Sequence, residues 1–250
     1  MEKEFTYLEW RMAIRFAVCR GKEHRGISFM GIITGYLALI CLLLLLAKFV
    51  TRRIHNDRLD RFFLKLHKPV SAAFVIMTVV HLLLTLPVFR TRSLAVILSG
   101  IAALIILILM ITLCHSIKNG KEKMHWHRIL SVILLLLAVV HIVTYYIDFG
   151  NYQRKISEIE ITQTDLSRIK DGQYTGEYDA GYIYAKVSVT VKEGKITGID
   201  ILEHRNERGQ SAESITDRIL EEQSLSVDAV SGATNSSLVI KKACENALQP

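Results

Sequence analysis

The stretch Ser93-Leu-Ala-Val-Ile-Leu-Ser-Gly-Ile-Ala-Ala-Leu-Ile-Ile-Leu-Ile-Leu-Met-Ile-Thr-Leu-Cys114 contains no charged residue. About 20 apolar residues in a helix cross the ~30 Å hydrocarbon core of a bilayer, because an α-helix rises ~1.5 Å per residue. Three further runs have the same character, at residues 27–50, 69–89 and 129–147. We therefore expect a membrane-embedded, all-α four-helix bundle over residues 27–147, with both chain ends on the same side of the bilayer.

Charge separates the two halves of the chain. Residues 1–150 carry a net charge of +11, whereas residues 151–250 carry −4. The basic residues flank the apolar runs, which is typical of a membrane surface and not of nucleic-acid binding. The loops on the two sides carry ten Lys or Arg each, so positive charge does not decide the orientation. The four cysteines form no Cys-x-x-Cys pair, which argues against a disulfide framework or a thiolate metal site.

Three segments lie outside the expected bundle. Residues 1–26 mix aromatic and basic residues at helical spacing and lack the apolar core of a signal peptide. We interpret them as an interfacial amphipathic helix, with a disordered tail as the alternative. Residues 148–170 read as a polar linker, and residues 171–250 as a small soluble α+β domain.

Hydrophobic periodicity predicts the elements of this last domain. Apolar residues alternate over 183–191, which predicts a half-buried strand, and 192–195 is a hairpin turn that leads to a return strand at 196–202. Helices are expected over 212–223 and 236–248. The Ser and Asn residues just before the second helix are favoured N-cap residues.

Four histidines of the bundle repeat one spacing. His67 and His81 are 14 residues apart, and so are His127 and His141. Fourteen residues make ~3.9 helical turns and rise ~21 Å, so each pair lies nearly on one helix face at two depths. Because the second and fourth spans run in the same direction, we expect His67 to face His127 and His81 to face His141. Two facing imidazoles at each depth are suited to bis-imidazole ligation of haem iron, which predicts two b-type haems, or at least one.

Other interpretations of these histidines stay open. His125 is the alternative to His127, although it would point ~200° away around the helix. A buried histidine also packs against a carbonyl or hydroxyl group in many proteins, and a proton relay or a quinone pocket is the main rival function. The His spacing nevertheless resembles the transmembrane domain of ferric-reductase-like and related di-haem b cytochromes. Only four spans are evident here, which departs from the larger members.

Four motifs of the C-terminal part resemble the FMN-binding domain family, which occurs in membrane NADH:quinone oxidoreductase subunits and in flavinylated extracytoplasmic reductases. They are Asp171-Gly-Gln-Tyr-Thr-Gly-Glu-Tyr178, Lys192-Glu-Gly-Lys-Ile-Thr197, Ile201-Leu-Glu-His-Arg205 and Asp228-Ala-Val-Ser-Gly-Ala-Thr-Asn-Ser-Ser237. The resemblance implies that a dedicated flavin transferase esterifies the FMN phosphate to the threonine of Ser-Gly-Ala-Thr, here Thr234. The family motif has an acidic residue six positions earlier, and Asp228 stands there.

The local chemistry at Thr234 suits a phosphate ester. A helix is expected to begin near Asn235, and its free N–H groups and dipole favour an anion by ~0.3–1 kcal/mol. The neighbours expected to bind the cofactor are Ser231, Gly232, Ala233, Asn235 and Ser236, and the resemblance brings His204 and Gly209 toward the flavin ring. The alternatives are a polar turn that only caps a helix and, for His204 and Gly209, a solvated loop.

The chain shows no dinucleotide fingerprint, so electrons are expected to come from quinol or a partner protein. The predicted function is transmembrane electron transfer from quinol, or from a membrane or cytoplasmic donor, through b-type haems to covalent FMN, which reduces an extracytoplasmic acceptor. Flavin transferases of the family act outside the cytoplasm, which implies a multi-pass plasma-membrane protein with its FMN domain outside and the haem at His81 and His141 nearer the flavin. The alternative is a non-catalytic flavin-bearing sensor or assembly subunit of a redox complex.

Overall fold

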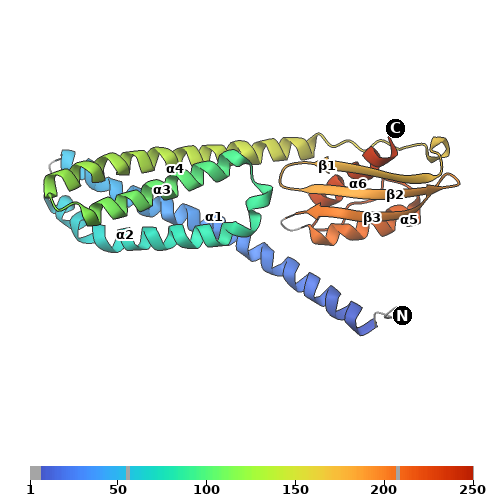
Figure 1. Cartoon of the computed structure of the whole chain (residues 1–250), viewed down its shortest axis with the longest axis horizontal. Helices are drawn as coiled ribbons and strands as arrows, with labels where there is room; N and C mark the ends of the chain where they lie inside the picture. Colours follow the sequence, from blue (N-terminus) through green and yellow to red (C-terminus); the bar gives the residue numbers. More distant parts are fainter. Residues whose placement is uncertain (1–6, 55–56, 207–208, 250) are drawn as a thin grey trace. The chain divides into compact units, whose positions relative to one another are not determined.

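The computed structural model describes residues 7–54, 57–206 and 209–249, with side chains from Met30 onward except that of Arg52. The chain divides into two compact units, Ile27–Asp148 and Phe149–Pro250 together with Met1–Gly26. We call residues 27–148 the bundle and residues 149–249 the C-terminal domain, and each is described by itself. The fold class is the expected one, four long apolar helices followed by a small α+β domain (Figure 1).

Four long helices make up the bundle. They are α1 (Tyr7–Ile54), α2 (Asp57–Thr85), α3 (Leu94–Ser116) and α4 (Gly120–Ser157). Each contains a segment long and apolar enough to cross a membrane, which confirms the four expected spans. In the most apolar window of each span, no more than 17% of the residues are buried by protein, so lipid has to cover most of the helical surface. The amphipathic helix expected over residues 1–26 falls on the start of α1, where no side chains are described, and on residues outside the described chain.

Short connections fix where α2 and α3 end and begin. Pro87 is the second residue of a short 3-10 helix, η1 (Leu86–Thr91), which follows α2; proline supplies no N–H to continue the α-helical hydrogen bonds. Ser93 precedes α3, and its backbone N–H donates to the carboxylate of Asp148 on α4 at 3.2 Å. This bond satisfies one of the free N–H groups at the start of α3 and joins the two helices.

The centre of the bundle is filled by one large apolar side chain from each helix. These four, which we call the central layer, are Leu42, Phe74, Leu107 and Leu134. Each is less than 8% exposed. They separate the interior of the bundle into two halves, and this separation shapes the site described below.

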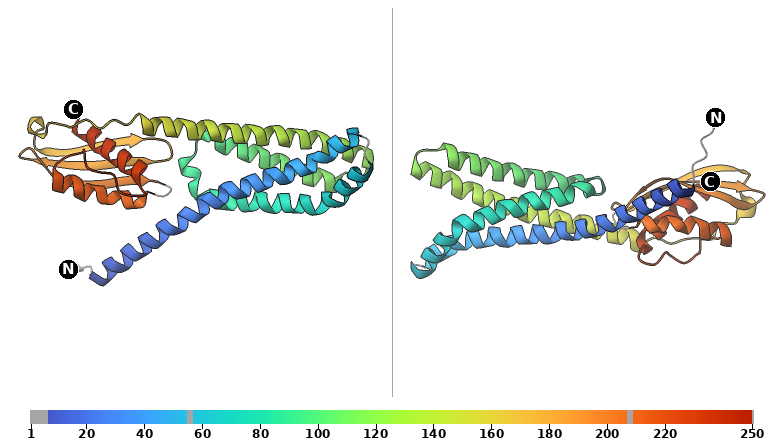
Figure 2. Two further views of the ribbon diagram at one scale, coloured as in Figure 1. Left: turned by 180° about the vertical axis from the view of Figure 1, so that it is seen from behind. Right: turned by 90° about the horizontal axis from the view of Figure 1, so that it is seen from below.

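The C-terminal domain contains a three-stranded antiparallel sheet in the order β1 (Gly172–Asp179), β2 (Tyr184–Lys192) and β3 (Lys195–Arg205). The alternation over 183–191 correctly predicts β2, and the hairpin and return strand are also confirmed. β1 was not predicted from periodicity, because this edge strand buries only Gly176 fully. The helices α5 (Ile215–Glu222) and α6 (Thr234–Leu248) lie against one face of the sheet (Figure 2).

Close backbone contact holds α6 on the sheet. A Cβ atom at Gly176 of β1 would lie 2.3 Å from the backbone nitrogen of Ala247 and 2.4 Å from the carbonyl oxygen of Ala243. Only glycine therefore allows β1 to approach α6 this closely. The helix expected over 212–223 begins instead as a 3-10 turn, η3 (Gln210–Ser214), before α5 starts at Ile215.

The segment expected as a linker over residues 148–170 contains ordered elements. α4 ends only at Ser157, and a 3-10 turn, η2 (Leu166–Arg168), follows. Tyr152 and Ile156 belong to the buried core of the C-terminal domain. The backbone N–H of Thr162 donates at 2.9 Å to the buried carboxylate of Glu245 on α6.

Candidate functional site

The four histidines of the 14-residue repeat form two pairs in the bundle. The ring centroids of His67 and His127 are 5.9 Å apart, and those of His81 and His141 are 6.4 Å apart. A metal–imidazole nitrogen bond of ~2.0–2.1 Å on each side, as in zinc sites, would set two ligand nitrogens ~4 Å apart and two ring centroids roughly 6 Å apart. Both pairs therefore fit one metal ion between two imidazoles, which is what bis-imidazole haem ligation requires.

At the His81 and His141 pair, the hydrogen-bond partners favour a proton on Nδ1 of both rings. Nδ1 of His81 lies 2.7 Å from the carbonyl oxygen of Gly31, which can only accept, so this nitrogen carries the proton. Nδ1 of His141 lies 3.0 Å from Oγ of Ser99. The Ser99 hydroxyl donates its single proton to the carbonyl of Val96, so it accepts from His141. Each Nε2 is left with its lone pair, as a metal ligand needs.

The Nδ1 atoms of the His67 and His127 pair have weaker hydrogen-bond acceptors or none among the described residues. Nδ1 of His127 faces Sγ of Cys114 at 3.5 Å, and sulfur is a weak acceptor. Nδ1 of His67 is buried and has no hydrogen-bond partner within the described part of the chain. The two pairs are therefore similar in ring separation and different in what holds the rings.

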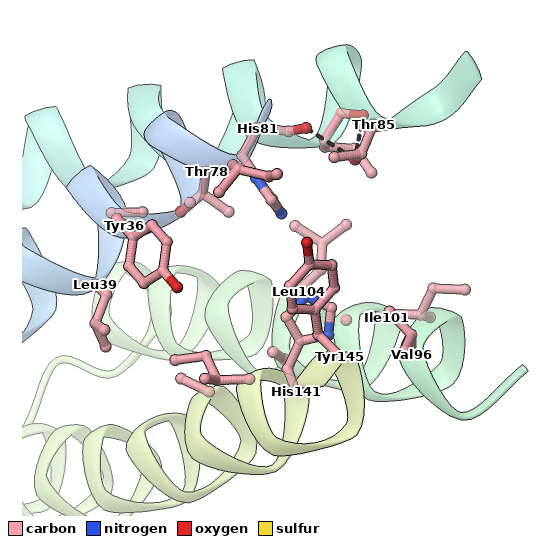
Figure 3. Close-up of a pocket in the computed structure, with 18 of the residues that line it drawn as sticks. Tyr36, Leu39, Thr78, His81, Thr85, Val96, Ile101, Leu104, His141 and Tyr145 are labelled. Atoms are coloured by element: carbon pink, nitrogen blue, oxygen red, sulfur yellow. Dashed lines mark hydrogen bonds between the residues drawn. The ribbon is translucent and has the colours of Figure 1, made fainter. Parts of the chain in front are cut away.

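Each pair lies in its own cavity. The His81 cavity, of about 260 Å³, is lined by both rings of that pair, and Figure 3 shows His81 of α2 and His141 of α4 facing this space. The His67 cavity, of about 410 Å³, is lined by His67 and His127. The four side chains of the central layer line both cavities and are the only residues that the two linings share.

The structure also places the alternative histidine. His125 is exposed and contacts the ring of Trp126, whereas His127 faces His67. No cluster of three or more His, Cys, Asp or Glu side chains suited to a metal ion occurs among the described residues. A haem supplies four ligands to its own iron and needs two from the protein, so the pairs remain suited to it.

Small residues that the spacing of histidines does not reveal make room for the rings. A Cβ atom at Gly35 would lie 3.0 Å from the His81 ring, and one at Gly100 would lie 3.1 Å from the His141 ring. Gly31 and Gly35 form a Gly-x-x-x-Gly pattern on α1, the sequence signal of close helix approach in membranes. That pattern could have identified these residues, whereas nothing in the sequence singles out Ser99.

In the C-terminal domain, Thr234 is the first residue of α6 and its side chain is exposed. Gly232 has a φ of +77°, a left-handed conformation that favours glycine at this turn. The N-cap residue is Ala233, so the prediction of a Ser or Asn cap is wrong. The polar side chains are used elsewhere: Asn235 donates to the hydroxyl of Tyr152 at 2.8 Å, and Ser237 accepts from the backbone N–H of Val230 at 3.0 Å.

Cations hold the loop that leads to Thr234. Nζ of the buried Lys241 donates to the carbonyl of Val227 at 2.9 Å, and Arg218 donates to the backbone carbonyl of Asp228 at 3.4 Å. Burial lowers the pKa of Lys241, and the nearby Asp228 carboxylate partly opposes this. The Asp228 side chain is exposed, and so is that of Ser231. Both are therefore accessible to a modifying enzyme.

The two predicted cofactor-binding segments meet at Gly209 and Ser236. A Cβ atom at Gly209 would lie 1.7 Å from Oγ of Ser236, so the two residues are in direct contact. The side chain of His204 is 1% exposed, and its Nδ1 lies 2.9 Å from the carboxylate of Glu213. Asn206 connects His204 with Gly209. Its side-chain nitrogen contacts Nδ1 of His204, and its side-chain oxygen accepts a hydrogen bond from the N–H of Gly209.

Two polar atoms in this region are buried without a hydrogen-bond partner in the described chain, Nε2 of His204 and Oγ of Ser236. An unsatisfied buried polar group costs ~1–3 kcal/mol, so such atoms often mark a ligand site. The oxygen and nitrogen atoms of a flavin phosphate or ring can form hydrogen bonds with these two atoms. In contrast, the only described cysteine of this domain, Cys244, is not a redox candidate, because burial raises the pKa of its thiol to about 12.

An aromatic cluster adjoins α6 through Asn235. The rings of Tyr152 and Tyr182 stack with centroids 4.8 Å apart and planes 10° apart, and Phe149 lies 6.2 Å from each. The fold thus brings Tyr182, from the connection between β1 and β2, together with Tyr152 of α4.

Residues 180–249 match the family model described as an FMN-binding domain. The match includes Thr234 and the segment from His204 to Gly209, and it supports FMN as a ligand and flavin-linked electron transfer as the kind of function. No curated protein and no solved structure matches the chain.

Proposed function

We propose that this protein carries electrons across a membrane, with b-type haems held by the two His pairs of the bundle and FMN esterified to Thr234. The observation that carries the proposal is the pair of separate cavities, each with two facing imidazoles, on a chain that also has an FMN-binding domain. The cofactors supply the redox chemistry, since haem moves single electrons and flavin couples these to two-electron donors and acceptors.

The residues of the bundle support haem ligation over a proton relay. A relay would require hydrogen-bonded groups that connect the two depths, but the central layer between the cavities is apolar. The protonation pattern of His81 and His141 leaves two lone pairs that face one another, as iron requires. Apolar lining also suits the face of a porphyrin ring, and Arg92 and Tyr145 add polar groups at the His81 cavity.

The residues around Thr234 support a covalent flavin. The threonine hydroxyl is accessible at a helix start, where the dipole favours a phosphate. Gly232, Ala233 and Asn235 shape the turn, while Ser236, His204 and Gly209 form the adjacent buried polar region. We propose that a flavin transferase recognises Asp228 and Ser231 on the exposed side of this loop.

The proposed direction is from quinol, or from a membrane or cytoplasmic partner, through the haems to FMN and an extracytoplasmic acceptor. The C-terminal domain then faces outward from the plasma membrane. The outward placement fits the covalent attachment proposed above, because a tethered flavin cannot diffuse away from a protein outside the cell.

The haem proposal is tested by absorption spectra of the purified protein in detergent. We expect a Soret band and reducible b-type α bands equivalent to two haems per chain. His141→Ala should lose one haem, whereas His125→Ala should keep both, because His125 faces away from the pair. Flavin absorbance without haem would contradict the electron-transfer proposal and favour the sensor or assembly role.

The attachment proposal is tested by flavin fluorescence in a denaturing gel. The wild-type band should fluoresce, and Thr234→Ala should abolish the fluorescence completely. Thr197→Ala, which changes an exposed threonine of β3, should leave it unchanged. A fluorescent Thr234→Ala band would show that the flavin is attached elsewhere.

A further inference from the structure

The two His pairs differ in the hydrogen bonds made by Nδ1. At the His81 cavity both Nδ1 atoms donate to oxygen, one to the Gly31 carbonyl at 2.7 Å and one to Ser99 Oγ at 3.0 Å. At the His67 cavity the corresponding atoms meet only the sulfur of Cys114 at 3.5 Å or, for His67, no partner in the described chain. All four rings are partly buried, so the asymmetry in the Nδ1 partners does not follow from one pair being exposed and the other enclosed.

Such a difference has a known electronic consequence for a metal ligand. An imidazole whose N–H donates to a good acceptor becomes more basic and gives more electron density to its metal. Higher electron density stabilises the oxidised ion over the reduced one. Axial-ligand hydrogen bonding is therefore one of the levers by which a protein sets the reduction potential of haem iron.

Basic side chains stand near both cavities. Lys48 of α1 acts electrostatically on His67 and His127, His115 lines the His67 cavity, and Arg92 lines the His81 cavity. The Nδ1 partners contact the proposed ligands themselves and are the feature that separates the two sites most clearly.

We infer that the site at His81 and His141 has the lower reduction potential of the two, and that a single electron in the bundle rests at the site of His67 and His127. The inference builds on the proposed haem ligation. Each site exchanges one electron with the other or with the donors and acceptors named above, and no proton or group moves. Ser99, Gly31 and Cys114 are positioning residues that act through the histidines.

The test is a spectroelectrochemical titration of the full-length holoprotein in detergent, which should resolve two one-electron components. Ser99→Ala should move the lower component to a more positive potential and leave the upper component in place. Cys114→Ser should act reciprocally, because a hydroxyl would accept from Nδ1 of His127 and move the upper component to a more negative potential. Both variants should therefore reduce the difference between the two reduction potentials, Ser99→Ala by raising the lower potential and Cys114→Ser by lowering the higher one.

Matched controls separate this electronic effect from a change in packing. Ser131 of α4 lines the His67 cavity, but its hydroxyl donates to the backbone carbonyl of His127 and makes no Nδ1 contact. Ser131→Ala should shift neither component. If Ser99→Ala lowers haem occupancy, Ser99→Cys leaves no empty space beside His141 but offers a weaker acceptor, and it should shift the same component in the same direction by less.

The outcomes distinguish the inference from the proposal on which it rests. A wild-type protein without haem would overturn the proposed function. Two haems with one common potential, or a Ser99→Ala shift confined to the upper component, would overturn only the order of potentials. An unchanged titration curve for both Ser99→Ala and Cys114→Ser would likewise overturn the inferred order of potentials and leave the proposed function in place.

Discussion

The bundle and the C-terminal domain place their polar groups differently. The bundle buries apolar side chains in its central layer and encloses the four imidazoles in the cavities on either side of that layer, while many of its large apolar side chains are exposed on the outer surface. The C-terminal domain encloses an apolar core, with Val187, Val189 and Ile240 fully buried, and presents Thr234 at its surface. In the bundle the candidate site is marked by the few histidines inside a largely apolar interior, whereas in the soluble domain it is marked by buried polar atoms that lack a partner among the described residues.

The comparison predicts that a substitution can unfold one unit and leave the other folded. The largest effect on stability is expected at Gly176. Gly176→Ala places a Cβ atom 2.3 Å from the backbone of α6, which cannot move as a side chain does. We expect a loss of about 3 kcal/mol or more in the stability of the C-terminal domain, at the upper end of overpacking effects. Denaturant unfolding followed by flavin fluorescence measures the loss, and the haem spectrum should stay unchanged.

Gly198→Ala is the control within the same sheet. Its nearest neighbour is 3.9 Å from the added Cβ atom, so the stability should change by no more than about 0.5 kcal/mol. If the Gly176 and Gly198 variants unfold at the same denaturant concentration, close packing of β1 on α6 is not what stabilises the domain. If the Gly176 variant also loses haem, the two units are not independent.

A smaller and more local effect is expected in the bundle at Gly35. In Gly35→Val, the Cβ atom lies 3.0 Å from the His81 ring, and the added methyl groups push the ring from the Gly31 carbonyl. The haem content should fall from two to about one per chain, since about half of the proposed ligand pairs are affected. Haem extraction quantifies the loss, and covalent flavin should be retained.

Gly120→Ala is the corresponding control, because nothing lies within 4 Å of its added Cβ atom. Full haem content in Gly35→Val would show that the His81 ring does not need its present position. Loss of haem in both glycine variants would point instead to general damage to the bundle.

The smallest effect is expected at Glu245, where it depends on pH. Burial raises the pKa of this carboxyl, but hydrogen bonds from Lys242 and Thr162 outweigh burial and hold the pKa below its ordinary value of 4.5. A depressed carboxyl pKa stabilises the fold above the unfolded-state pKa, and this stabilisation is lost as the pH falls through the folded-state pKa. Glu245→Gln should therefore cost about 1–2 kcal/mol at pH 7, because a charge-assisted hydrogen bond is lost.

Unfolding curves at a series of pH values measure this cost. The difference between wild type and Glu245→Gln should shrink as the pH falls below 4.5. Asp165→Asn is a useful control, because the pKa of Asp165 is also lowered, by hydrogen bonds from Ser167, but the carboxylate is solvent-exposed. A constant difference from pH 7 to pH 3 would exclude a pH-dependent role of Glu245.

Local sequence patterns predicted the elements that depend on one periodicity. The four spans follow from apolar length, and β2 with its return strand follows from alternation. β1 escaped prediction because its inward positions are glycines and tyrosines, so its alternating burial is not accompanied by alternating hydrophobicity in the sequence. The N-cap of α6 was predicted wrongly because Asn235 and Ser237 bond to Tyr152 and Val230, which are brought near only by the fold.

In the candidate site, too, some features could be predicted from local sequence and others could not. The spacing of His67, His81, His127 and His141 fixed their depths and faces, since a helix converts sequence separation into rise and angle regardless of its neighbours. The motif around Thr234 likewise identified the start of α6 and the proposed flavin position. These features reside in one helix or one turn, so the amino-acid sequence alone determined them.

The tertiary structure decided which atoms surround them. Gly31, Ser99 and Cys114 reach the Nδ1 atoms from neighbouring helices, and Gly209 contacts Ser236 although η3 and α5 separate the two residues in the chain. Such contacts depend on distances of a few ångströms between segments that no local periodicity relates. They distinguish the two His pairs from one another, because hydrogen-bond strength is set by the partner atom and its distance and not by the spacing of the ligands.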